Sequence, residues 1–432
     1  MIFLILLLLC LSLFVTVLVF RVNRNHLNQI FLTLFLANFI LGHVLLLTFR
    51  LVTQATNPVL LGDSRLIDST VNLRYIILLN VLQFFCIQFG YLLSQKFWRN
   101  KHTSIRTLPP SINRALIGMT IFGWVGNIAV QFGKNNLFSA FHPFEILGTM
   151  WIVSGFRLKD MSIFYPIFFG TTHLIWAIFF FHSKSEAFVI LVALLIRLLH
   201  ANPKNLKAKI SGIIIMTVVL FPFIQTKKGI ETASAAQTIL TQSGSSYSAI
   251  RSYFIGILQR FDGADSITDA YLAGGGTWYN AYDYSKILIS KFIPNVSFLV
   301  GNYFGENSEK SRSMGQLWND QMRPYSVVNV TSGVPVTYGP LAEGYAISGL
   351  VLGIVLSISF GILISKFCDL NYSTNLLSIA IGMYFISHLE TMQNSTGTLI
   401  LLLPKALQCF FMFYLLKVCL SNKRLTRKKF TI

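Results

Sequence analysis

Residues 1–20 read MIFLILLLLCLSLFVTVLVF and contain no charged side chain. A helix needs about 20 consecutive, mostly apolar residues to cross the roughly 30 Å of hydrocarbon in a bilayer. The stretch has no basic segment before it and is too long for the core of a signal peptide. It therefore predicts a first membrane-spanning helix that is retained in the mature protein.

The composition of the whole chain agrees with this prediction. Of its 432 residues, 53% are hydrophobic, 14% are aromatic and only 12% are charged. Soluble domains carry about 25% charged residues, so a water-soluble enzyme of this length could not cover its surface with so few. The composition predicts an all-α integral membrane protein.

Ten further apolar stretches follow the first. Nine of them, long enough to be candidate spans, are 29–49, 75–95, 115–133, 161–181, 187–200, 210–226, 341–365, 374–389 and 396–416. The remaining one, 143–156, is short and contains Glu145, so its hydropathy alone leaves its crossing open. Counting it gives about 11 transmembrane helices.

The distribution of basic residues decides between ten and eleven crossings. With eleven, one side of the membrane holds 20 of the 35 lysines and arginines but only 2 of the 16 acids. Because basic residues concentrate in cytoplasmic loops, this side is predicted to be cytoplasmic, with the N-terminus outside and the C-terminus inside. With ten crossings, Lys204, Lys207 and Lys209 would move to the outer side. The net charge of +19 is therefore interpreted as an orientation signal.

Four parts follow from this topology. They are N-terminal transmembrane helices (1–226), a large extracytoplasmic loop (227–340), C-terminal transmembrane helices (341–416) and a basic cytoplasmic tail (417–432). Apolar residues recur at helical spacing within the loop at 248–261 and 284–300, which predicts short amphipathic helices along the membrane surface. A small packed extracellular cap is the alternative.

The sequence lacks the motifs of several enzyme classes. It contains no Walker-type phosphate loop, HExxH, CxxC pair or GxSxG, and its eight histidines do not cluster at metal-ligand spacing. Its five cysteines lie in or beside apolar runs, which gives no disulfide framework. We therefore expect no metal, no other cofactor and no nucleic-acid partner, and we expect the basic tail to contact anionic membrane lipids. His173, within a span, is predicted to have a hydrogen-bonded packing role.

Ionisable groups near a bilayer are costly and are therefore candidates for function. Arg260 opens the loop sequence RFDGADSITDAYLAGGG, where a guanidinium with glycine amides nearby suits a pyrophosphate. Lys184, in the short outer turn HSKSE, is a candidate to hold the phosphate end of a lipid-linked substrate, and Glu343 lies at the outer mouth of a span. Plainer explanations stay open. These are a loose ion pair of Lys184 with Glu186 and an acid that favours a helix N-terminus.

Four segments around the large loop carry a family resemblance. They are HSKSEAFVILVALL (182–195), RFDG (260–263), FIPNVSFLVGNYFGE (292–306) and Glu343-Gly344-Tyr345 before a glycine-rich span. In their order and spacing, over about residues 180–361, they resemble the Wzy-type polymerases of bacterial O-antigen and exopolysaccharide repeat units. Two departures from the family pattern are Lys184, where the family usually has arginine, and Asn295, where an arginine is expected. Two alternatives stay open for the second: that Arg312 or Arg323 substitutes, or that the lipid pyrophosphate is bound differently.

The resemblance implies a GT-C-like fold and a metal-independent, inverting glycosyltransferase. Its substrates would be undecaprenyl-pyrophosphate-linked glycans in the outer leaflet of the bacterial plasma (inner) membrane, and a chain-length regulator is a further candidate partner. Positive side chains would stabilise the leaving pyrophosphate, and an acid would take the proton of the acceptor hydroxyl. The expected pyrophosphate-binding residues are Arg260, Lys184 and Arg323, and the expected catalytic residues are Arg260, Glu343 and Asp262, with Asp265 as a further acid.

Other functions compete with polymerisation. An O-antigen ligase would use the same donor and show the same architecture, but a resemblance to such ligases would imply a histidine and arginines in the large outer loop, and residues 227–340 contain no histidine. A polysaccharide flippase or other secondary transporter tends to show repeated halves, and we find no internal repeat. A purely structural subunit of a polysaccharide export machine stays open.

Overall fold

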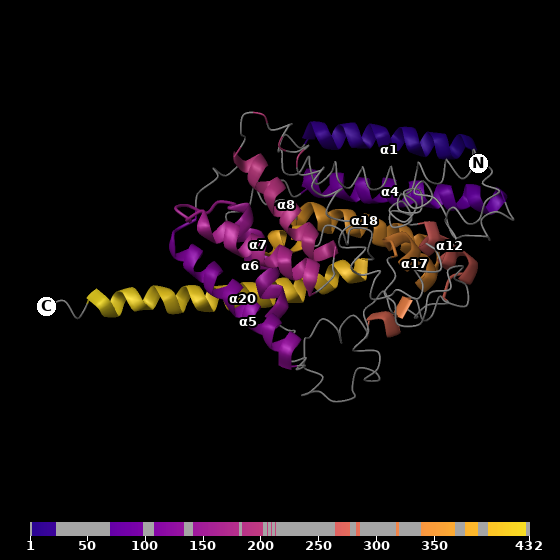
Figure 1. Ribbon diagram of the computed structural model, residues 1–432. Coiled ribbons are helices and arrows are strands. Elements are labelled where there is room, and N and C mark those ends of the chain that lie inside the picture. Colours follow the sequence, from indigo (N-terminus) through magenta and orange to yellow (C-terminus); the bar gives the residue numbers. More distant parts are fainter. Residues whose placement is uncertain are drawn as a thin grey trace, which may run out of the picture. The chain divides into compact units, whose positions relative to one another are not determined.

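The structure is a computed structural model in which the described residues are almost all helical and include no strand (Figure 1). The all-α fold class is thereby confirmed. The described residues are 2–22, 70–97, 108–133, 141–180, 184–201, 205, 209, 212, 264–276, 282–285, 317–318, 338–367, 376–387 and 396–428. Contacts divide the chain into two compact units. The first unit is Met1–Arg99, Ser243–Lys366 and Thr391–Pro404, and the second is Asn100–Gln242, Phe367–Glu390 and Lys405–Ile432.

The first unit is built on two long apolar helices that lie side by side, α1 and α4 (Figure 1). A polar contact joins them, since Gln88 of α4 donates its side-chain N–H to the hydroxyl of Thr16 of α1. The helices of this unit are α1 (Ile2–Val22), α4 (Thr70–Phe97), α12 (Ala264–Ala273), α17 (Pro340–Ser348), α18 (Leu350–Phe367) and the start of α20 (Thr396–Lys428).

Glycines allow α4 and α18 to approach closely. A Cβ added at Gly90 of α4 would collide with the backbone carbonyl of Ile358, and one added at Gly361 of α18 would collide with that of Ile87. Near this contact, Gln95 donates to the hydroxyl of Ser365 at 3.0 Å. Small residues at the contact and hydrogen bonds between helices are typical of helix packing in membranes.

The predicted single span 341–365 is two helices in the structure. The first, α17, ends at Ser348, and α18 begins at Leu350. Gly349 between them has φ 89°, a left-handed value that interrupts a right-handed helix and that glycine adopts without steric cost. The sequence-based prediction of one continuous helix was wrong here. A single glycine does not lower the hydropathy of an apolar stretch, so hydropathy does not reveal a helix break at that residue.

The second unit surrounds the short helix α6. Every residue of α6 from Pro143 to Ser154 is buried, and α5, α7, α8 and α19 pack against it. Its 13 residues rise about 20 Å, less than the thickness of the hydrocarbon core. The helices of this unit are α5 (Ser111–Gly133), α6 (His142–Ser154), α7 (Phe164–Phe179), α8 (Lys184–Ala201), α19 (Leu376–Ser387) and α20 after Pro404.

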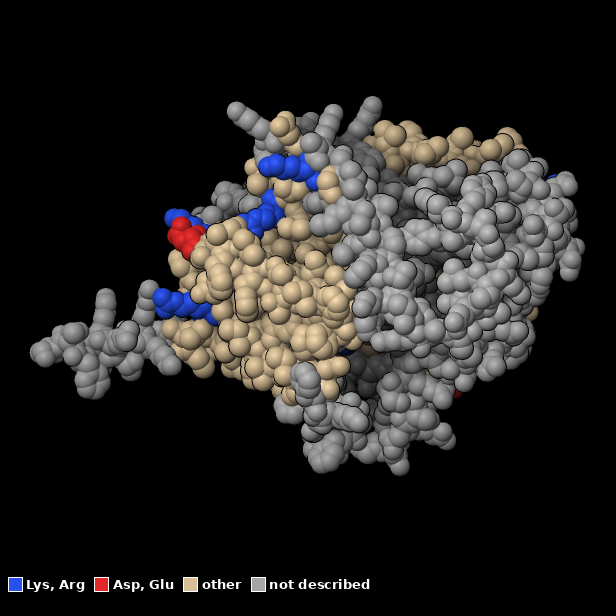
Figure 2. All heavy atoms as spheres, in the orientation of Figure 1, with Lys and Arg blue, Asp and Glu red and all other residues tan. Residues whose placement is uncertain are grey.

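Two described helical segments, Arg74–Gln95 and Ile400–Leu420, are long and apolar enough to cross a membrane, judged by length and composition alone. On the face of the second unit that Figure 2 shows, a broad area is uncharged and the charged side chains lie at its margin. The predicted total of about 11 crossings stays a prediction. The predicted segments 29–49 and 248–261 lie outside the described residues, as do 210–226 except Gly212 and 284–300 except its first two residues. Shorter apolar helices are Phe3–Leu18, Phe164–Phe179, Leu350–Lys366 and Leu376–Ser387.

Candidate functional site

Glu343 is the predicted site residue whose surroundings the structure describes. It lies in the first turn of α17. Lys184 is the first residue of α8, in the second unit, and its side chain is outside the described part. Arg260, Asp262 and Arg323 also lie outside the described residues. The site is therefore built outward from Glu343.

The start of α17 is fixed partly by α4. Gly339 precedes the helix in an extended conformation, and Pro340 occupies its first turn, where a missing N–H costs nothing. The backbone N–H of Leu341 donates to Oε1 of Gln83 on α4 at 3.0 Å, which satisfies one of the free amides at a helix N-terminus. A Cβ on Gly339 would come within 2.5 Å of the same oxygen. Glycine is therefore what allows Gln83 to reach the helix start.

Tyr284 of the large loop donates its hydroxyl hydrogen to Oε1 of Glu343. The Glu343 side chain is fully buried, and Tyr284 is only 8% exposed. Burial, reinforced by the negative charge of Glu343 and by Tyr338, raises the pKa of Tyr284 well above its ordinary value of about 10. The phenol therefore stays protonated at neutral pH and remains a hydrogen-bond donor to the carboxylate.

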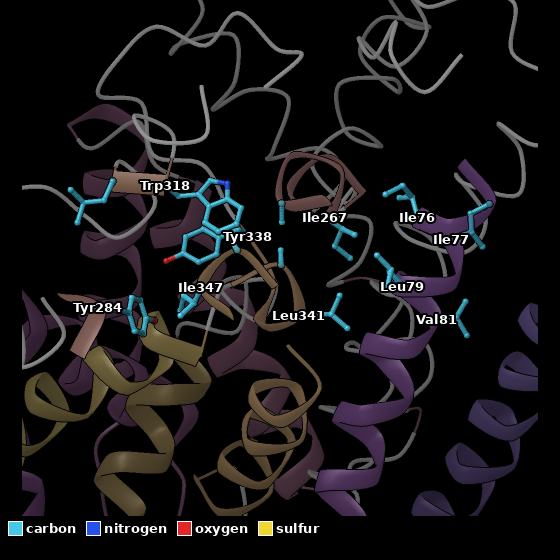
Figure 3. Packing of buried hydrophobic residues seen from close by; sticks show 14 of the residues in the cluster. Ile76, Ile77, Leu79, Val81, Ile267, Tyr284, Trp318, Tyr338, Leu341 and Ile347 are labelled. Atoms are coloured by element: carbon cyan, nitrogen blue, oxygen red, sulfur yellow. The ribbon is translucent and has the colours of Figure 1, made fainter. Parts of the chain in front are cut away.

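Aromatic rings from separate parts of the loop pack beside this pair. Trp318 and Tyr338 stack with their ring centroids 4.4 Å apart and an interplanar angle of 8°. Figure 3 shows the two rings face to face, with Tyr284 and Ile347 below them. All four belong to one buried cluster that also includes apolar residues of α4, α12 and α17. The loop segments around Glu343 thus form part of a packed core.

Helix α12 connects the loop to α17 and α4. It packs against both helices through buried Ile267 and Ala270. At its C-terminal end, the N–H of Gly276 donates to the carbonyl of Ala346 in α17 at 3.0 Å, so the triple glycine 274–276 is joined to α17 backbone to backbone. In the sequence, α12 begins directly after RFDG (260–263). The segment that carries Arg260 and Asp262 therefore leads straight into a helix that contacts the helix of Glu343.

The chemistry that this arrangement allows follows from its burial. A buried carboxylate that accepts a hydrogen bond from a protonated phenol can fix a loop in one position. In the conformation described, Glu343 has no exposed surface through which it could touch a substrate. No group of histidine, cysteine and acidic side chains among the described residues could hold a metal ion.

Comparison of the chain with protein-family models, with curated proteins and with solved structures finds no match.

Sequence reasoning did not find Tyr284 or Gln83 as partners of the site, and no local pattern marks either. It also missed a buried group in the second unit that contains Glu145 and His173, which are hydrogen-bonded to one another at 2.7 Å. A signal for this group was present, because both residues lie inside apolar stretches where ionisable side chains are costly. The prediction that His173 is hydrogen-bonded in the packing is confirmed.

Replacing Tyr284 with phenylalanine is expected to destabilise the first unit by roughly 1–3 kcal/mol, because the buried Glu343 carboxylate loses a donor. The measurement is thermal unfolding of the purified protein in detergent. Tyr282→Phe, at an exposed ring in the same short helix, is the matched control and should have little effect. When Glu343 is already glutamine, Tyr284→Phe should lower the free energy of unfolding by less than it does in the wild-type protein. An equal loss of stability with Glu343 and with glutamine at this position would contradict a stabilising hydrogen bond between the two side chains.

Proposed function

We propose that the chain is an integral membrane glycosyltransferase that joins lipid-linked oligosaccharide repeat units at the outer leaflet of the bacterial plasma membrane. The observation that carries the proposal is the packing of α12 against α17. Two sequence segments that resemble repeat-unit polymerases adjoin or lie within these helices. RFDG (260–263) directly precedes α12, and Glu343-Gly344-Tyr345 lies within α17. Segment Glu343-Gly344-Tyr345 thus lies in a helix that packs against α12, which follows RFDG directly in the sequence.

The proposed reaction needs charge stabilisation more than a strong acid. The acceptor sugar hydroxyl forms a new C–O bond at the anomeric carbon of the donor glycan, and the bond from that carbon to the undecaprenyl-pyrophosphate oxygen breaks with inversion. The pyrophosphate leaves with the bonding electron pair, and a carboxylate takes the hydroxyl proton. Arg260, Lys184 and Arg323 are the proposed cations for the developing negative charge, and Asp262 is the proposed proton acceptor.

Glu343 has a positioning role in this proposal. Its carboxylate is buried and accepts the hydrogen bond of Tyr284, so it joins the large loop to α17 and does not itself contact the sugar in this conformation. If the loop moves during the reaction, the carboxylate becomes available, and Glu343 is then the second candidate for the proton acceptor beside Asp262.

A membrane location is supported by apolar side chains on the surface of α7 and the residue before it. Ile163, Phe164, Ile167 and Phe168 are all exposed, and soluble monomers rarely leave such large contiguous apolar patches in water. The glycine-mediated contact between α4 and α18 also fits a lipid environment, where small residues allow backbones to approach. With the charge distribution along the sequence, these features favour a multi-span protein with the large loop outside.

Deletion of the gene is expected to reduce long surface polysaccharide to single repeat units that are still attached to their acceptor. The reason is that polymerisation stops while export and ligation continue. Gel separation of surface glycans by length measures this, and re-expression of the intact chain should restore long glycans. If deletion leaves no glycan on the acceptor at all, the protein is instead a ligase or a flippase.

A further inference from the structure

The second unit contains a chain of four ionisable side chains that the proposed reaction does not use. We propose that His173 and Glu145 form a buried proton-binding site, and that this site exchanges its proton with the surface through Glu186 and His142. The proposal does not depend on the polymerase function, because it rests on the second unit alone.

Both ring nitrogens of His173 face oxygen atoms. Nε2 lies 2.9 Å from the backbone carbonyl of Glu186, and Nδ1 lies 2.7 Å from Oε1 of Glu145. A carbonyl only accepts hydrogen bonds, so Nε2 carries a hydrogen. A neutral imidazole has one hydrogen, and the contact at Nδ1 therefore needs a second proton, either on the ring or on the carboxyl group. The pair holds one proton more than a neutral imidazole beside a carboxylate.

Burial explains why this proton is retained. The side chains of His173 and Glu145 are 1% and 0% exposed. With the proton the pair has no net charge, and without it the pair leaves one negative charge in an apolar helix bundle, which is costly. Thr149 donates to Oε1 of Glu145 at 2.8 Å, but Oε2 has no hydrogen-bond partner among the described residues. An ionised Glu145 would thus be poorly compensated unless His173 carries the matching charge.

Glu186 and His142 extend from this pair toward the surface. Oε2 of Glu186 is 3.5 Å from Nε2 of His173, and Oε1 of Glu186 is 3.1 Å from Nε2 of His142. Side-chain exposure rises along the chain, from 1% at His173 through 15% at Glu186 to 28% at His142. Nδ1 of His142 is 3.1 Å from Oδ1 of Asn127, which orients the outermost ring. The group therefore has one buried end and one accessible end.

Loading of the pair moves one proton and no electrons. In the unloaded pair, the neutral ring of His173 donates through Nδ1 to Glu145 and leaves Nε2 free of hydrogen. Protonated His142 gives a proton from Nε2 to Glu186 Oε1 and later regains one from solvent. Rotation of the Glu186 carboxyl group about its Cγ–Cδ bond then turns this O–H toward His173, and the proton passes to His173 Nε2. The new N–H donates to the carbonyl of Glu186, which is the hydrogen bond that the structure contains.

The helices around the pair also bring other described side chains near it. Helix α5 presents Trp124 edge-on to the His173 ring, at 6.4 Å between centroids, and contributes no titratable side chain to the group. On α8, Arg197 instead donates to the carbonyl of Val153, at the opposite end of α6. Described titratable groups near this group include Tyr384 of α19, which interacts electrostatically with Glu186, and Cys409 of α20, which interacts with Tyr384 and with Lys405.

The test compares the pH dependence of stability in the wild-type protein and in Glu145→Gln. The glutamine donates to Nδ1 of a neutral His173, so the variant needs no extra proton. Above about pH 6.5, the ordinary pKa of histidine, the wild-type unfolding equilibrium constant is expected to rise with pH by up to about tenfold per unit more steeply than that of the variant, because the folded state holds one proton that the unfolded state releases. Unfolding of the full chain in detergent, followed at each pH, gives both slopes.

Asp160→Asn is the matched control, since it changes an exposed acid of the same unit to its amide and should keep the wild-type slope. Equal slopes in the wild-type protein and Glu145→Gln would overturn the proposal. If Glu145→Gln does not fold, Glu145→Met also removes the carboxylate, leaves His173 neutral and replaces it in the comparison. For the path, a pH jump followed by fluorescence of Trp124, in a background where the other tryptophans are phenylalanine, should show slower loading in Glu186→Gln. An unchanged rate there would exclude Glu186 from the path.

Discussion

Replacement of Arg260 with alanine is expected to abolish polymerisation while the protein remains in the membrane at its normal level. Under the proposed function, the guanidinium stabilises the pyrophosphate as negative charge develops on it. Loss of one such preorganised donor typically lowers the rate by about 10²–10³-fold. Surface glycans should then be mainly single repeats. Gel separation of surface glycans, with immunodetection of the protein in membranes, measures both quantities.

Arg251→Ala is the matched control for this prediction, since it removes the same side chain nine positions earlier in the same loop. It should leave long glycans in place. Arg260→Lys should restore only part of the activity, because an ammonium retains the charge but not the two-pronged contact with phosphate oxygens. Glycans of normal length in Arg260→Ala would refute the role assigned to this arginine. The class of reaction is tested separately by the gene deletion.

Replacement of Gly361 with alanine is expected to produce the largest loss of stability among conservative changes in the first unit. The new methyl group would occupy the position of the Ile87 carbonyl oxygen, which is rigid backbone within α4. The two helices must therefore separate, and overpacking of this kind costs roughly 1–3 kcal/mol, occasionally more. Thermal unfolding in detergent, followed by the reactivity of the buried thiol of Cys86 on α4, reports separation of this helix from its neighbours.

Gly118 of α5 provides the control for the same chemical change. A Cβ there would meet a side-chain atom of Leu416 at 3.7 Å, an ordinary van der Waals distance. Gly118→Ala should therefore be neutral or slightly stabilising, because alanine favours the helix by about 1 kcal/mol over glycine. If both substitutions lower stability equally, the loss in Gly361→Ala does not come from a collision between α18 and α4.

The sequence predicts where helices occur far better than how they end or meet. The apolar stretch 75–95 lies within α4, and 396–416 lies within α20, because hydropathy and length dominate helix formation in such sequences. The break at Gly349 was not predicted, since it depends on one residue with φ 89°. Stretch 143–156 was recognised as unusual for its acid, and the structure explains the acid through its contact with His173.

The partners of buried polar groups could not be predicted from the sequence. Glu145 and His173 are 28 positions apart on different helices, and their contact depends on how α6 and α7 pack. A close approach of α5 and α6 contributes to that packing, since a Cβ at Gly123 would lie 2.7 Å from the Cβ of Glu145. Tyr284 and Glu343 are likewise 59 positions apart. Such pairs depend on tertiary packing, which cannot be predicted from the local pattern of a single sequence.

Gln83 contacts the first turn of α17 from α4, a helix long and apolar enough to cross a membrane. A shift of α4 by one helical turn would move Gln83 by about 5.4 Å and break its hydrogen bond to Leu341. A mismatch between the length of an apolar helix and the thickness of the bilayer can shift or tilt the helix. The orientation of the helix that carries Glu343 is therefore expected to respond to the lipid composition of the membrane around the protein.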